Sequence, residues 1–555
     1  MTKTRTVHGL LEAAAGRCPD RPALRDDLRE LTFSDWWRVA RHMAALLSDA
    51  GAGRGHLVGA VADRSAILPC LFTAVSLIGA RFVALDPDWS SEDRKRVFDR
   101  WSGRLVACAR GMTLPDAAGG MILELDEDVF DGNRVEPLEP PDSEDDDLYL
   151  NVTSASTGQA KVAPTTHRQL IANTAGVCRT LGLTERDVHL SLFSASGHPH
   201  ELFMRGLFLG GLTVLTEKRF PRDLLDVMEE RGVTAVMALP TQFGGLSKIW
   251  GRPGQSPPAV RMAEAGGMHV SREFAESFVE KTGVDLIPVW GSTETAGVVL
   301  AGDPGRDGFS RVVDGYSVEV RDSSGAPVAD GGSGEMWVSG PGVVDRYQGD
   351  RLQNEEAFVD GWYRTGDMFS VMDGRMSFLG RRGGLIKAVG VKVYPLEVEL
   401  AILRHPGVDD VCVVATDHPV RGEMPSAWIV PRPGVELSAS GMRVFLRSLL
   451  DEHKIPRLFN FVTGLPMTAS GKIDRKAVGV REVATDIRGE LLRSDVELVR
   501  LLNYRAGLMA PGGSGFDPNW VDEQEDNAVG HNAGPASDSS IRSIIRFIIH
   551  ELGKG

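Results

Sequence analysis

Two mainly apolar strands joined by an apolar helix are the feature that most constrains the fold of this chain. Residues 58–61 and 81–85 have the character of buried strands, and residues 67–78 between them have the length and composition of a buried helix. A helical crossover of this kind joins parallel strands, and helices then cover both faces of the parallel sheet. The segment therefore predicts an α/β fold built on helix-covered sheets.

The same alternation continues along most of the chain. Residues 8–50 show helical periodicity twice, separated by a strand-like segment at 30–33. Helical segments such as 224–230 alternate with further buried strands, which we expect at 148–152, 213–215, 235–238 and 285–289. Turns rich in Gly and Asp between 302 and 334 indicate a change to smaller β units. A chain of 555 residues has the length of three to four compact units of roughly 150 residues each, so we expect a multidomain protein.

Composition and charge exclude several classes of protein. Apolar residues make up 42% and charged residues 25% of the chain, which excludes wholesale disorder and a collagen-like repeat. The net charge of −15, from 61 Lys+Arg against 76 Asp+Glu, argues against a nucleic acid as the main partner. The amino terminus lacks a signal-peptide core, and no window approaches 18 uninterrupted apolar residues. We therefore expect a cytoplasmic protein without membrane insertion.

The cysteines predict reduced and mostly buried thiols. Their number is odd and none is spaced as CxxC, so neither a disulfide framework nor a zinc site is indicated. The five positions are Cys18, Cys70, Cys108, Cys178 and Cys412.

A loop rich in hydroxyl groups follows the strand expected at 148–152. Residues 153–161 read Thr-Ser-Ala-Ser-Thr-Gly-Gln-Ala-Lys. Hydroxyl and backbone N–H donors in such a loop can surround phosphate oxygens, Gly158 permits a tight turn, and Lys161 supplies a compensating charge. The loop is not a Walker motif, because no Gly-Lys pair is followed by Ser or Thr. Taken alone, such a cluster is also typical of an ordinary turn.

Further motifs combine chemistry-bearing residues with turns. Residues 290–294, Trp-Gly-Ser-Thr-Glu, follow an apolar strand and place a ring that could stack on a base beside a carboxylate that could hold a metal. Residues 363–367, Tyr-Arg-Thr-Gly-Asp, offer a carboxylate able to bind vicinal hydroxyls. Next come Gly-Arg-Arg at 380–382 and a turn at 466–475 that presents Lys472. Any one of these could be a core aromatic residue, a turn carboxylate or a solvated charge, but their combination favours a functional site.

In this order and spacing, the motifs closely resemble those of the adenylate-forming superfamily, which comprises acyl-CoA synthetases, luciferases and the adenylation domains of peptide synthetases. The resemblance covers about residues 8–480 and includes the paired glycines Gly266 and Gly267 and the segment around Lys387. It implies a large amino-terminal domain of helix-covered sheets over residues 1–379, a hinge at 380–384, and a small mobile α+β domain with a catalytic lysine over residues 385–481.

The resemblance implies a two-step reaction. A carboxylate attacks the α-phosphate of ATP to give acyl-AMP and pyrophosphate, and a pantetheine thiol of CoA or of a carrier protein then displaces AMP. In-line attack between two anions needs charge neutralisation and positioning, so Mg²⁺ on Glu294 and a cation such as Lys472 are the expected tools. Rotation of the small domain between the half-reactions would bring Lys387 towards the path of the thiol.

Nucleotide-binding roles carry over from the resemblance position by position. Trp290 would stack on adenine, Asp367 would bind the ribose hydroxyls, and Arg381 would contact ribose or phosphate. The remaining nucleotide-binding candidates lie in the phosphate loop and the glycine-containing motifs: Thr153, Ser154, Ser156, Thr157, Gly158, Lys161, Gly266, Gly267, Gly291, Ser292 and Thr293.

Clues to the substrate centre on residues 193–200. Members of the family that activate amino acids usually carry Asp directly after the residue that corresponds to Phe193, and this Asp pairs with the substrate ammonium. This chain has Ser194 at that position. An uncharged hydroxyl cannot replace that ion pair, so we expect a carboxylic acid without an α-amino group. Family analogy adds residues 237–243 and 265–268, so the pocket candidates are Phe193, Ser194, His198, Met237, Ala265 and Met268.

The phosphate loop and the hinge depart from the family pattern. Ala155, Gln159 and Val162 stand where Gly, Lys and Gly are usual, which narrows backbone freedom and removes one positive charge. Two alternatives therefore stay open: a ligase that performs only the second half-reaction from a preformed acyl-adenylate, and a nucleotide-binding scaffold without catalysis. In the hinge, Gly383 and Gly384 stand where Asp or Lys is common, which predicts free rotation.

The carboxy-terminal end predicts a linker and a helix. Residues 482–540 form the linker, because the stretch 511–540 is too poor in large apolar residues to fold alone. Residues 541–553 predict an amphipathic helix with its apolar face formed by Ile541, Ile544, Ile545, Ile548 and Leu552. Two interpretations stay open: this helix packs back on the enzyme, or it docks a carrier protein or second chain.

Overall fold

The computed structural model describes most of the chain up to Val478. The described residues are 5–61, 63–85, 103–109, 121–134, 140–152, 161–251, 258–304, 306, 308–349, 351–388, 391–418, 422–467 and 473–478. Residues up to Ile473 belong to one compact unit, and the short helical turn at 475–478 belongs to the next. The linker at 482–540 and the tail helix at 541–553 lie outside the described residues, so both stay predictions.

A six-stranded sheet contains the strands from which the fold was predicted. Its order is β6-β5-β3-β4-β7-β8, with β7 and β8 antiparallel and the other neighbours parallel. Helix α3 joins β3 to β4, and all its residues are buried, as expected for a crossover helix. The strands and the helices of this amino-terminal part are β3 Leu57–Val61, β4 Arg81–Ala84, β5 Gly103–Ala109, β6 Met121–Leu125, β7 Asp147–Val152, β8 Val162–Thr166, α1 Val7–Arg17, α2 Phe33–Asp49, α3 Ile67–Leu77 and the 3₁₀ helix η1 Glu127–Phe130.

A nine-stranded sheet follows, with the order β15-β14-β13-β12-β11-β9-β10-β1-β2. The run from β13 to β1 is parallel, and the outer strands at both ends are antiparallel. Its elements are β1 Pro22–Arg25, β2 Glu30–Thr32, β9 Val188–Ser191, β10 Leu212–Val214, β11 Ala235–Ala238, β12 Met262–Ala265, β13 Asp285–Ser292, β14 Gly297–Ala301, β15 Arg311–Val312, α5 His167–Leu181, α6 Met204–Leu209, α7 Pro221–Glu230, α8 Pro240–Ser247, α9 Arg272–Thr282, η2 Pro199–Leu202 and η3 Thr293–Thr295.

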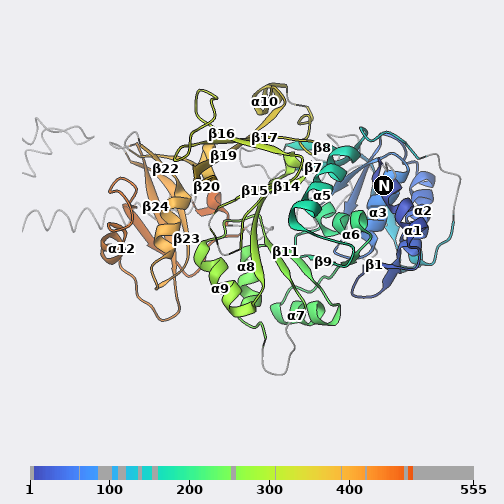
Figure 1. The fold of residues 1–555 in the computed structure, drawn as a ribbon, viewed down its shortest axis with the longest axis horizontal. Coiled ribbons are helices and arrows are strands. Elements are labelled where there is room, and N and C mark those ends of the chain that lie inside the picture. The colour runs from blue at the N-terminus through green and yellow to red at the C-terminus, as the bar shows by residue number, and fades with distance from the viewer. Residues whose placement is uncertain are drawn as a thin grey trace, which may run out of the picture. The chain divides into compact units, whose positions relative to one another are not determined.

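Helices cover both faces of this sheet, and alternate residues of each strand enter different cores (Figure 1). In β11, Val236 packs with α7, α8 and α9, whereas its neighbour Met237 packs with α5. The same alternation separates Leu286 from Ile287 in β13. The sequence expectation of a helix-covered parallel sheet is confirmed.

A third, antiparallel sheet of five strands packs on the α5 side, where Met336 and Phe369 join the same core as Met237. Its order is β16-β17-β19-β18, and β20 pairs with β19. This is the change to smaller β units expected from the turns after residue 302. Its elements are β16 Ser317–Arg321, β17 Ser333–Ser339, β18 Phe358–Val359, β19 Trp362–Met372, β20 Arg375–Arg381, α10 Arg351–Ala357 and η4 Arg382–Gly384.

The fourth sheet forms the smaller α+β part of the fold. It has the order β22-β21-β24-β23, with β25 parallel to β24, and a core of its own that includes Ile402, Val413 and Ile429. The expected fold class is thereby confirmed, while the domain boundaries at 379, 384 and 481 stay predictions. The elements are β21 Ile386–Ala388, β22 Val391–Val393, β23 Val408–His418, β24 Gly422–Pro431, β25 Leu458–Phe461, α11 Pro395–Leu403 and α12 Ala439–Leu446.

One expected strand ends earlier than the pattern indicated. Residues 30–33 read as a strand, but Phe33 is the first residue of α2. Thr32 caps that helix: its hydroxyl accepts from the Asp35 amide, and the Asp35 carboxylate accepts from the Thr32 amide. This reciprocal capping box stops the strand one residue short of the prediction.

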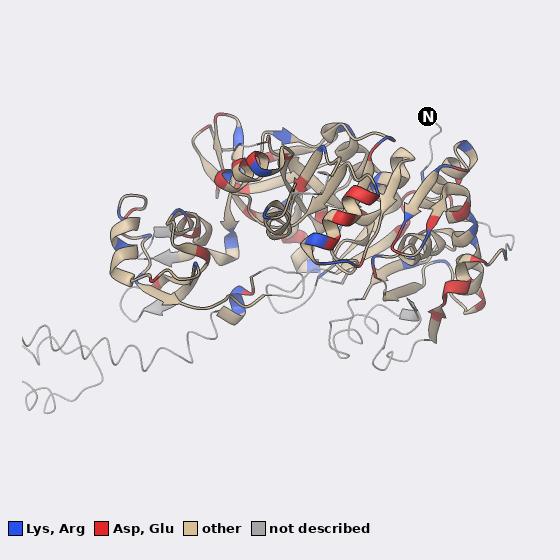
Figure 2. Ribbon diagram, turned by 90° about the horizontal axis from the view of Figure 1, so that it is seen from below, with Lys and Arg blue, Asp and Glu red and all other residues tan. Residues whose placement is uncertain are grey.

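The described residues also show where the charges and the cysteines lie and how long the helices are. Acidic and basic residues are interspersed along the described ribbon (Figure 2). All five cysteines are free, and four of them are buried, with Cys18 partly exposed. Among the helices that the structure describes, none is long and apolar enough to cross a membrane.

Candidate active site

Two residues predicted to bind the nucleotide, Trp290 and Arg381, contact the buried carboxylate of a third, Asp367. The indole Nε1 of Trp290, in β13, donates a hydrogen bond of 3.0 Å to Oδ2 of Asp367, in β19. Arg381, at the end of β20, places Nε 3.1 Å from Oδ1 of the same carboxylate. Asp367 is 4% exposed, whereas the Arg381 side chain is 66% exposed. The structure therefore joins the expected base platform, ribose carboxylate and arginine in one cluster.

The Asp367 carboxylate keeps one oxygen without a hydrogen bond. Its Oδ1 faces Arg381 as an ion pair, but no donor among the described residues meets it with hydrogen-bond geometry. Burial raises the pKa of Asp367 above its ordinary value, and the charge of Arg381 and the hydrogen bond from Trp290 offset part of that rise. A buried acceptor oxygen that lacks a donor is the group that a ligand hydroxyl would satisfy.

The second predicted carboxylate, Glu294, lies in η3 directly after β13 and is buried. Its Oε1 accepts a hydrogen bond of 2.6 Å from the hydroxyl of Tyr347, and Tyr347 is also hydrogen-bonded to Tyr363. Burial, together with the negative charge of Glu294, raises the pKa of both phenols, so both stay protonated and act as donors. Tyr347 was not among the sequence candidates.

Tyr347 also connects Glu294 to the end of the phosphate loop. The Nζ of Lys161 lies 4.8 Å from the centroid of the Tyr347 ring, a cation–π distance. The amide of Gln348 donates to the carbonyl of Val162, which fixes this segment beside β8. The other phosphate-loop candidates lie outside the described residues: Thr153, Ser154, Ser156, Thr157 and Gly158.

The turn that carries Glu294 depends on close backbone contact. A Cβ on Gly291 would lie 2.4 Å from the carbonyl oxygen of Gly297, so no larger residue fits there. Ser292 and Thr295 close the turn, since the Thr295 hydroxyl accepts from the Ser292 amide. Thr293 is half-buried between them. These glycine and hydroxyl positions therefore shape the loop around the carboxylate.

The substrate candidates fall into two groups. Phe193 and Met237 pack against the core on the α5 face, whereas Ala265 belongs to the core on the α8 and α9 face. Phe193 also lies near Gly266, where an added Cβ would be 3.6 Å from its ring. The structure thus brings Phe193 and buried Gly266 together, and exposed Gly267 follows directly.

The other pocket candidates lie on or near the surface. Ser194 is exposed, and its hydroxyl accepts a hydrogen bond of 3.1 Å from the Gly197 amide within its own turn. His198 is half-buried, with its ring 6.4 Å from that of Phe193. Met268 is half-buried two residues after Gly266.

The structure describes the expected hinge glycines Gly383 and Gly384 and the backbone of Lys387, but not Lys472. Gly383 and Gly384 belong to η4, and neither adopts a positive φ, so this conformation does not itself require glycine. Lys387 lies in β21. Lys472 lies outside the described residues, so its catalytic role stays a prediction from the resemblance.

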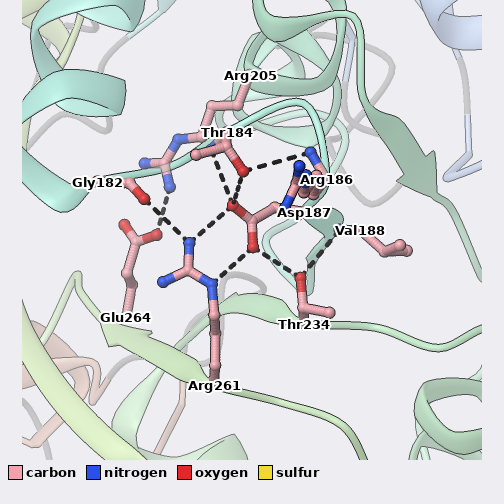
Figure 3. Close-up of polar contacts among 9 residues, drawn as sticks. All are labelled: Gly182, Thr184, Arg186, Asp187, Val188, Arg205, Thr234, Arg261 and Glu264. Atoms are coloured by element: carbon pink, nitrogen blue, oxygen red, sulfur yellow. Dashed lines mark hydrogen bonds and ion pairs between the residues drawn. The ribbon is translucent and has the colours of Figure 1, made fainter.

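Asp187 lies at the amino-terminal ends of the parallel strands of the nine-stranded sheet, and its carboxylate links the residues that precede three of them (Figure 3). We call this group the Asp187 clamp. Asp187 lies just before β9, and its carboxylate accepts from Thr234 before β11 and, through two nitrogens at 2.7 Å, from Arg261 before β12. Thr184 donates from its own loop. Because parallel strands start at one edge and end at the other, this clamp fixes the strands whose opposite ends carry Phe193 and Gly266.

A second buried ion-pair group lies beside the clamp (Figure 3). Arg205, in α6, contacts Glu264 of β12 at 2.6 Å and Glu201 of η2 at 3.3 Å. Burial alone would lower the pKa of Arg205, but the two carboxylates outweigh it and raise that pKa. Arg205 therefore links α6, which follows residues 193–200, to β12, which precedes Gly266. A small cavity beside Arg205 is lined by residues that include Ser191, His189 and Met237.

Sequence patterns gave no signal for three of these residues. Tyr347, Asp187 and Arg205 lie outside any recognised motif. Their partners are 53, 74 and 59 positions away, and such pairings depend on strand order.

Two family models match the chain. One, described as AMP-binding enzyme, covers residues 11–348, and the other, AMP-binding enzyme C-terminal domain, covers residues 397–472. The chain belongs to the AMP-binding enzyme family. The expected adenylate-forming class of enzyme is thereby confirmed.

Curated relatives of this AMP-binding enzyme include whole ligases and parts of larger proteins. It is 30% identical to 2-succinylbenzoate–CoA ligase from Bacillus velezensis, over 82% of this chain and 94% of that protein. It is 27% identical to naringenin synthase from Pestalotiopsis fici, over 96% of this chain but only 21% of that protein. The chain thus spans about a fifth of one relative and nearly the whole of the other.

A solved structure gives the same fold. The benzoate CoA ligase from Burkholderia xenovorans LB400 superposes with a TM-score of 0.78 at 23% identity, over 85% of this chain and 99% of that chain.

Proposed function

We propose that this enzyme activates a carboxylic acid with ATP and transfers the acyl group to a pantetheine thiol. The observation that carries the proposal is the buried Asp367, linked to Trp290 and Arg381, in a chain of the AMP-binding enzyme family. Its relatives include a 2-succinylbenzoate–CoA ligase and a feruloyl-CoA synthase.

Asp367 is suited to hold the ribose of the nucleotide. Its Oδ1 is a buried acceptor without a hydrogen bond, and a ribose hydroxyl supplies the missing donor. Trp290 provides an aromatic face for adenine, and exposed Arg381 remains available to a ribose or phosphate oxygen. The residues present therefore fit a nucleotide.

Glu294 is suited to hold a magnesium ion. Mg²⁺ is commonly bound through one or two carboxylates together with water and substrate phosphates, so the single carboxylate is sufficient here. The hydroxyl of Tyr347 occupies Oε1 and orients the carboxylate. When bound, the ion would neutralise phosphate charge during displacement of pyrophosphate.

The first half-reaction forms one bond and breaks another at the α-phosphorus. A carboxylate oxygen of the substrate bonds to phosphorus, and the bond from phosphorus to the bridging oxygen breaks, so pyrophosphate leaves with the electron pair. Both reactants are anions, so the protein must neutralise charge. We assign that role to Lys161 and Lys472, with the hydroxyls of the loop at 153–158 surrounding the leaving phosphates.

In the second half-reaction the thiol attacks the acyl carbon. The new carbon–sulfur bond replaces the carbon–oxygen bond to AMP, AMP leaves with the electron pair, and the thiol proton passes to solvent. We propose CoA or the phosphopantetheine of a carrier protein as the acceptor. Lys387 is the residue that we place near the thiol.

The substrate that we propose is a carboxylic acid without an α-amino group. Ser194 offers no charge to an ammonium ion, and its hydroxyl already accepts from Gly197. Phe193 and His198 add aromatic surface at the same segment, which suits a partly apolar acid. We also place the enzyme in the cytoplasm, where its five free thiols would remain reduced.

Mass spectrometry of reaction mixtures tests the proposal. Purified enzyme is incubated with ATP, Mg²⁺, CoA and a panel of carboxylic acids, and acyl-AMP and acyl-CoA are measured separately. We expect both products for at least one acid, and Lys472→Ala should lose acyl-AMP formation while its melting temperature is unchanged. Absence of both products across the panel would reject the proposal.

The altered phosphate loop favours one second candidate, a ligase specialised for the second half-reaction. Ala155, Gln159 and Val162 remove a lysine and two glycines from the usual pattern. Turnover of synthetic acyl-AMP with a thiol, without turnover of ATP and acid, would identify this function. Binding of ATP without turnover of either substrate would identify a non-catalytic scaffold.

A further inference from the structure

We propose that Glu335 positions the ribose-binding carboxylate of Asp367, an inference that rests on the proposed function. Glu335 lies in β17 and is 9% exposed. Among the described residues no hydrogen bond or ion pair joins Glu335 to Asp367, and Glu335 acts through the strand bulge that carries Asp367.

The bulge interrupts the pairing of β17 with β19. Glu335 is opposite Met368 and Trp337 is opposite Arg364, so two steps along β17 correspond to four along β19. Residues 365–367 of β19, which end at Asp367, therefore lie opposite the single residue Met336. A bulge redirects the side chain beside it, and here the redirected side chain reaches Trp290 on another sheet.

Glu335 holds the centre of this bulge. The Gly366 amide, at a φ of +70°, donates a hydrogen bond of 3.1 Å to Oε1 of Glu335. Oε2 accepts a bond of 2.8 Å from Arg364, on the other side of the bulge. Both oxygens of the Glu335 carboxylate therefore accept hydrogen bonds from β19, and one of these donors is the amide of the residue directly before Asp367.

Two other contacts support the same geometry from neutral groups. The Thr365 hydroxyl donates to the carbonyl of Met336 at 2.7 Å, and the Asp367 amide donates to that hydroxyl at 3.0 Å. These contacts fix the distance between the bulge of β19 and the neighbouring strand β17. Glu335 supplies the charged contact that sets the orientation of the Gly366 peptide, and hence the direction of Asp367.

Glu335 also contacts the segment that follows β20. Arg382, directly after Arg381, places Nη1 3.4 Å from Oε2 of Glu335. The Arg382 side chain is 63% exposed, so this contact is worth little by itself. The Glu335 carboxylate nevertheless contacts both Gly366, the residue before Asp367, and Arg382, the residue after Arg381.

The substitution that isolates this role is Glu335→Gln. Glutamine has one oxygen and one NH₂ group where three donors converge, so either Gly366 or the two arginines Arg364 and Arg382 lose their acceptor. The matched control is Glu319→Gln, in β16 of the same sheet, because among the described residues Glu319 forms an ion pair with Arg321 and with no residue of β19. Thr365→Val is a second variant, which perturbs the bulge without removing charge.

Ribose recognition is the readout that a merely structural role would not move. Isothermal titration calorimetry gives the dissociation constants of ATP and of 2′,3′-dideoxy-ATP, which lacks both ribose hydroxyls. We expect Glu335→Gln to reduce the preference for ATP over the dideoxy analogue about tenfold, the size of one hydrogen bond to a charged group. Glu319→Gln should keep the wild-type preference, and Thr365→Val should lose part of it.

Each outcome decides a different point. Wild-type protein that binds neither nucleotide rejects the proposed function. Wild-type protein with a clear preference for ATP, retained in folded Glu335→Gln, rejects the positioning role alone. If Glu335→Gln does not fold, as judged by its melting transition, the preference measured in Thr365→Val decides the role.

Discussion

Trp290 and Asp367 are 77 positions apart in sequence and meet through a hydrogen bond of 3.0 Å. The bond joins two different sheets, because Trp290 belongs to β13 and Asp367 to β19. One side chain of the pair has an aromatic face, and the other has a buried oxygen whose charge is balanced by exposed Arg381. A nucleotide, with a base and a ribose joined at a fixed distance, matches that combination.

This bond predicts that Trp290→Phe weakens nucleotide binding although the aromatic face remains. Loss of the Nε1 donor leaves a buried carboxylate with one less hydrogen bond, so the pKa of Asp367 should rise further. We expect the KM for ATP to rise about tenfold, which corresponds to roughly 1.4 kcal/mol.

Trp250→Phe is the control for that variant. Trp250 also lies beside a hydrophobic core, but its indole nitrogen has no hydrogen-bond partner among the described residues. The KM for ATP should therefore be unchanged in Trp250→Phe. An equal effect of both substitutions would show that the indole–carboxylate bond is unimportant.

Tyr347→Phe tests the role of the phenol that holds Glu294. The substitution removes a 2.6 Å hydrogen bond from Oε1 and leaves the aromatic ring for Lys161. A carboxylate that has lost its orienting partner should bind Mg²⁺ more weakly, by about tenfold. The measurement is the Mg²⁺ concentration required for half-maximal activity at saturating ATP. An unchanged requirement would show that Tyr347 has no part in the proposed metal site.

Asp187→Asn should destabilise the fold without a direct effect on the chemistry. Burial alone would raise the pKa of Asp187, but hydrogen bonds from Arg261, Thr184 and Thr234 outweigh it and lower that pKa below the ordinary 3.8. The ionised clamp therefore stabilises the fold above about pH 4, and its contribution is lost as the pH falls below that value. We expect a loss of about 2 kcal/mol at pH 7 in urea unfolding.

The clamp also predicts how that loss depends on pH. Because the wild-type advantage requires an ionised carboxylate, the difference between wild type and Asp187→Asn should shrink as the pH falls below 4. A difference that stays constant down to pH 3 would contradict the clamp.

Buried histidines predict a second, separate loss of stability in acid. Burial lowers the pKa of His8 from 6.5 to about 4 and that of His167 to about 3, where the charge of His8 contributes as well. His189 and His200 are lowered to about 4 for the same main reason. The unfolded chain therefore binds more protons than the folded chain between pH 6.5 and 4, so stability falls as the pH falls through that range.

His8→Asn measures the share of one such group. His8 Nδ1 lies 2.8 Å from the Ser76 hydroxyl, and its neutral ring contributes up to about 3 kcal/mol of pH-dependent stability. The variant should therefore lose less stability than wild type between pH 6.5 and 4, by up to one proton in the slope. Equal slopes would contradict the assignment of a lowered pKa to His8.

The fold was predictable where residues interact with near neighbours in sequence. The strand expected at 235–238 is β11, and the helix expected at 67–78 is α3 to within one residue. Apolar runs and crossover length carry this information locally. The strand at 30–33 was wrong at Phe33, because the capping box of Thr32 and Asp35 overrides the apolar pattern.

The candidate site was predictable only in part. Motifs identified Trp290, Asp367 and Arg381, and the fold brings them together. The residues that position them, such as Glu335, look like ordinary strand residues in sequence. Their partners are set by the register and bulges of a sheet, which depend on the whole assembly of strands.

ATP–pyrophosphate exchange across a panel of carboxylic acids tests the proposed function most directly. The assay follows incorporation of labelled pyrophosphate into ATP in the presence of Mg²⁺, so it reports reversible formation of acyl-AMP without any thiol acceptor. We predict exchange that depends on at least one acid without an α-amino group, and background exchange with α-amino acids. Background exchange with every acid of the panel, from folded protein that binds ATP, would contradict adenylation as the function of this chain.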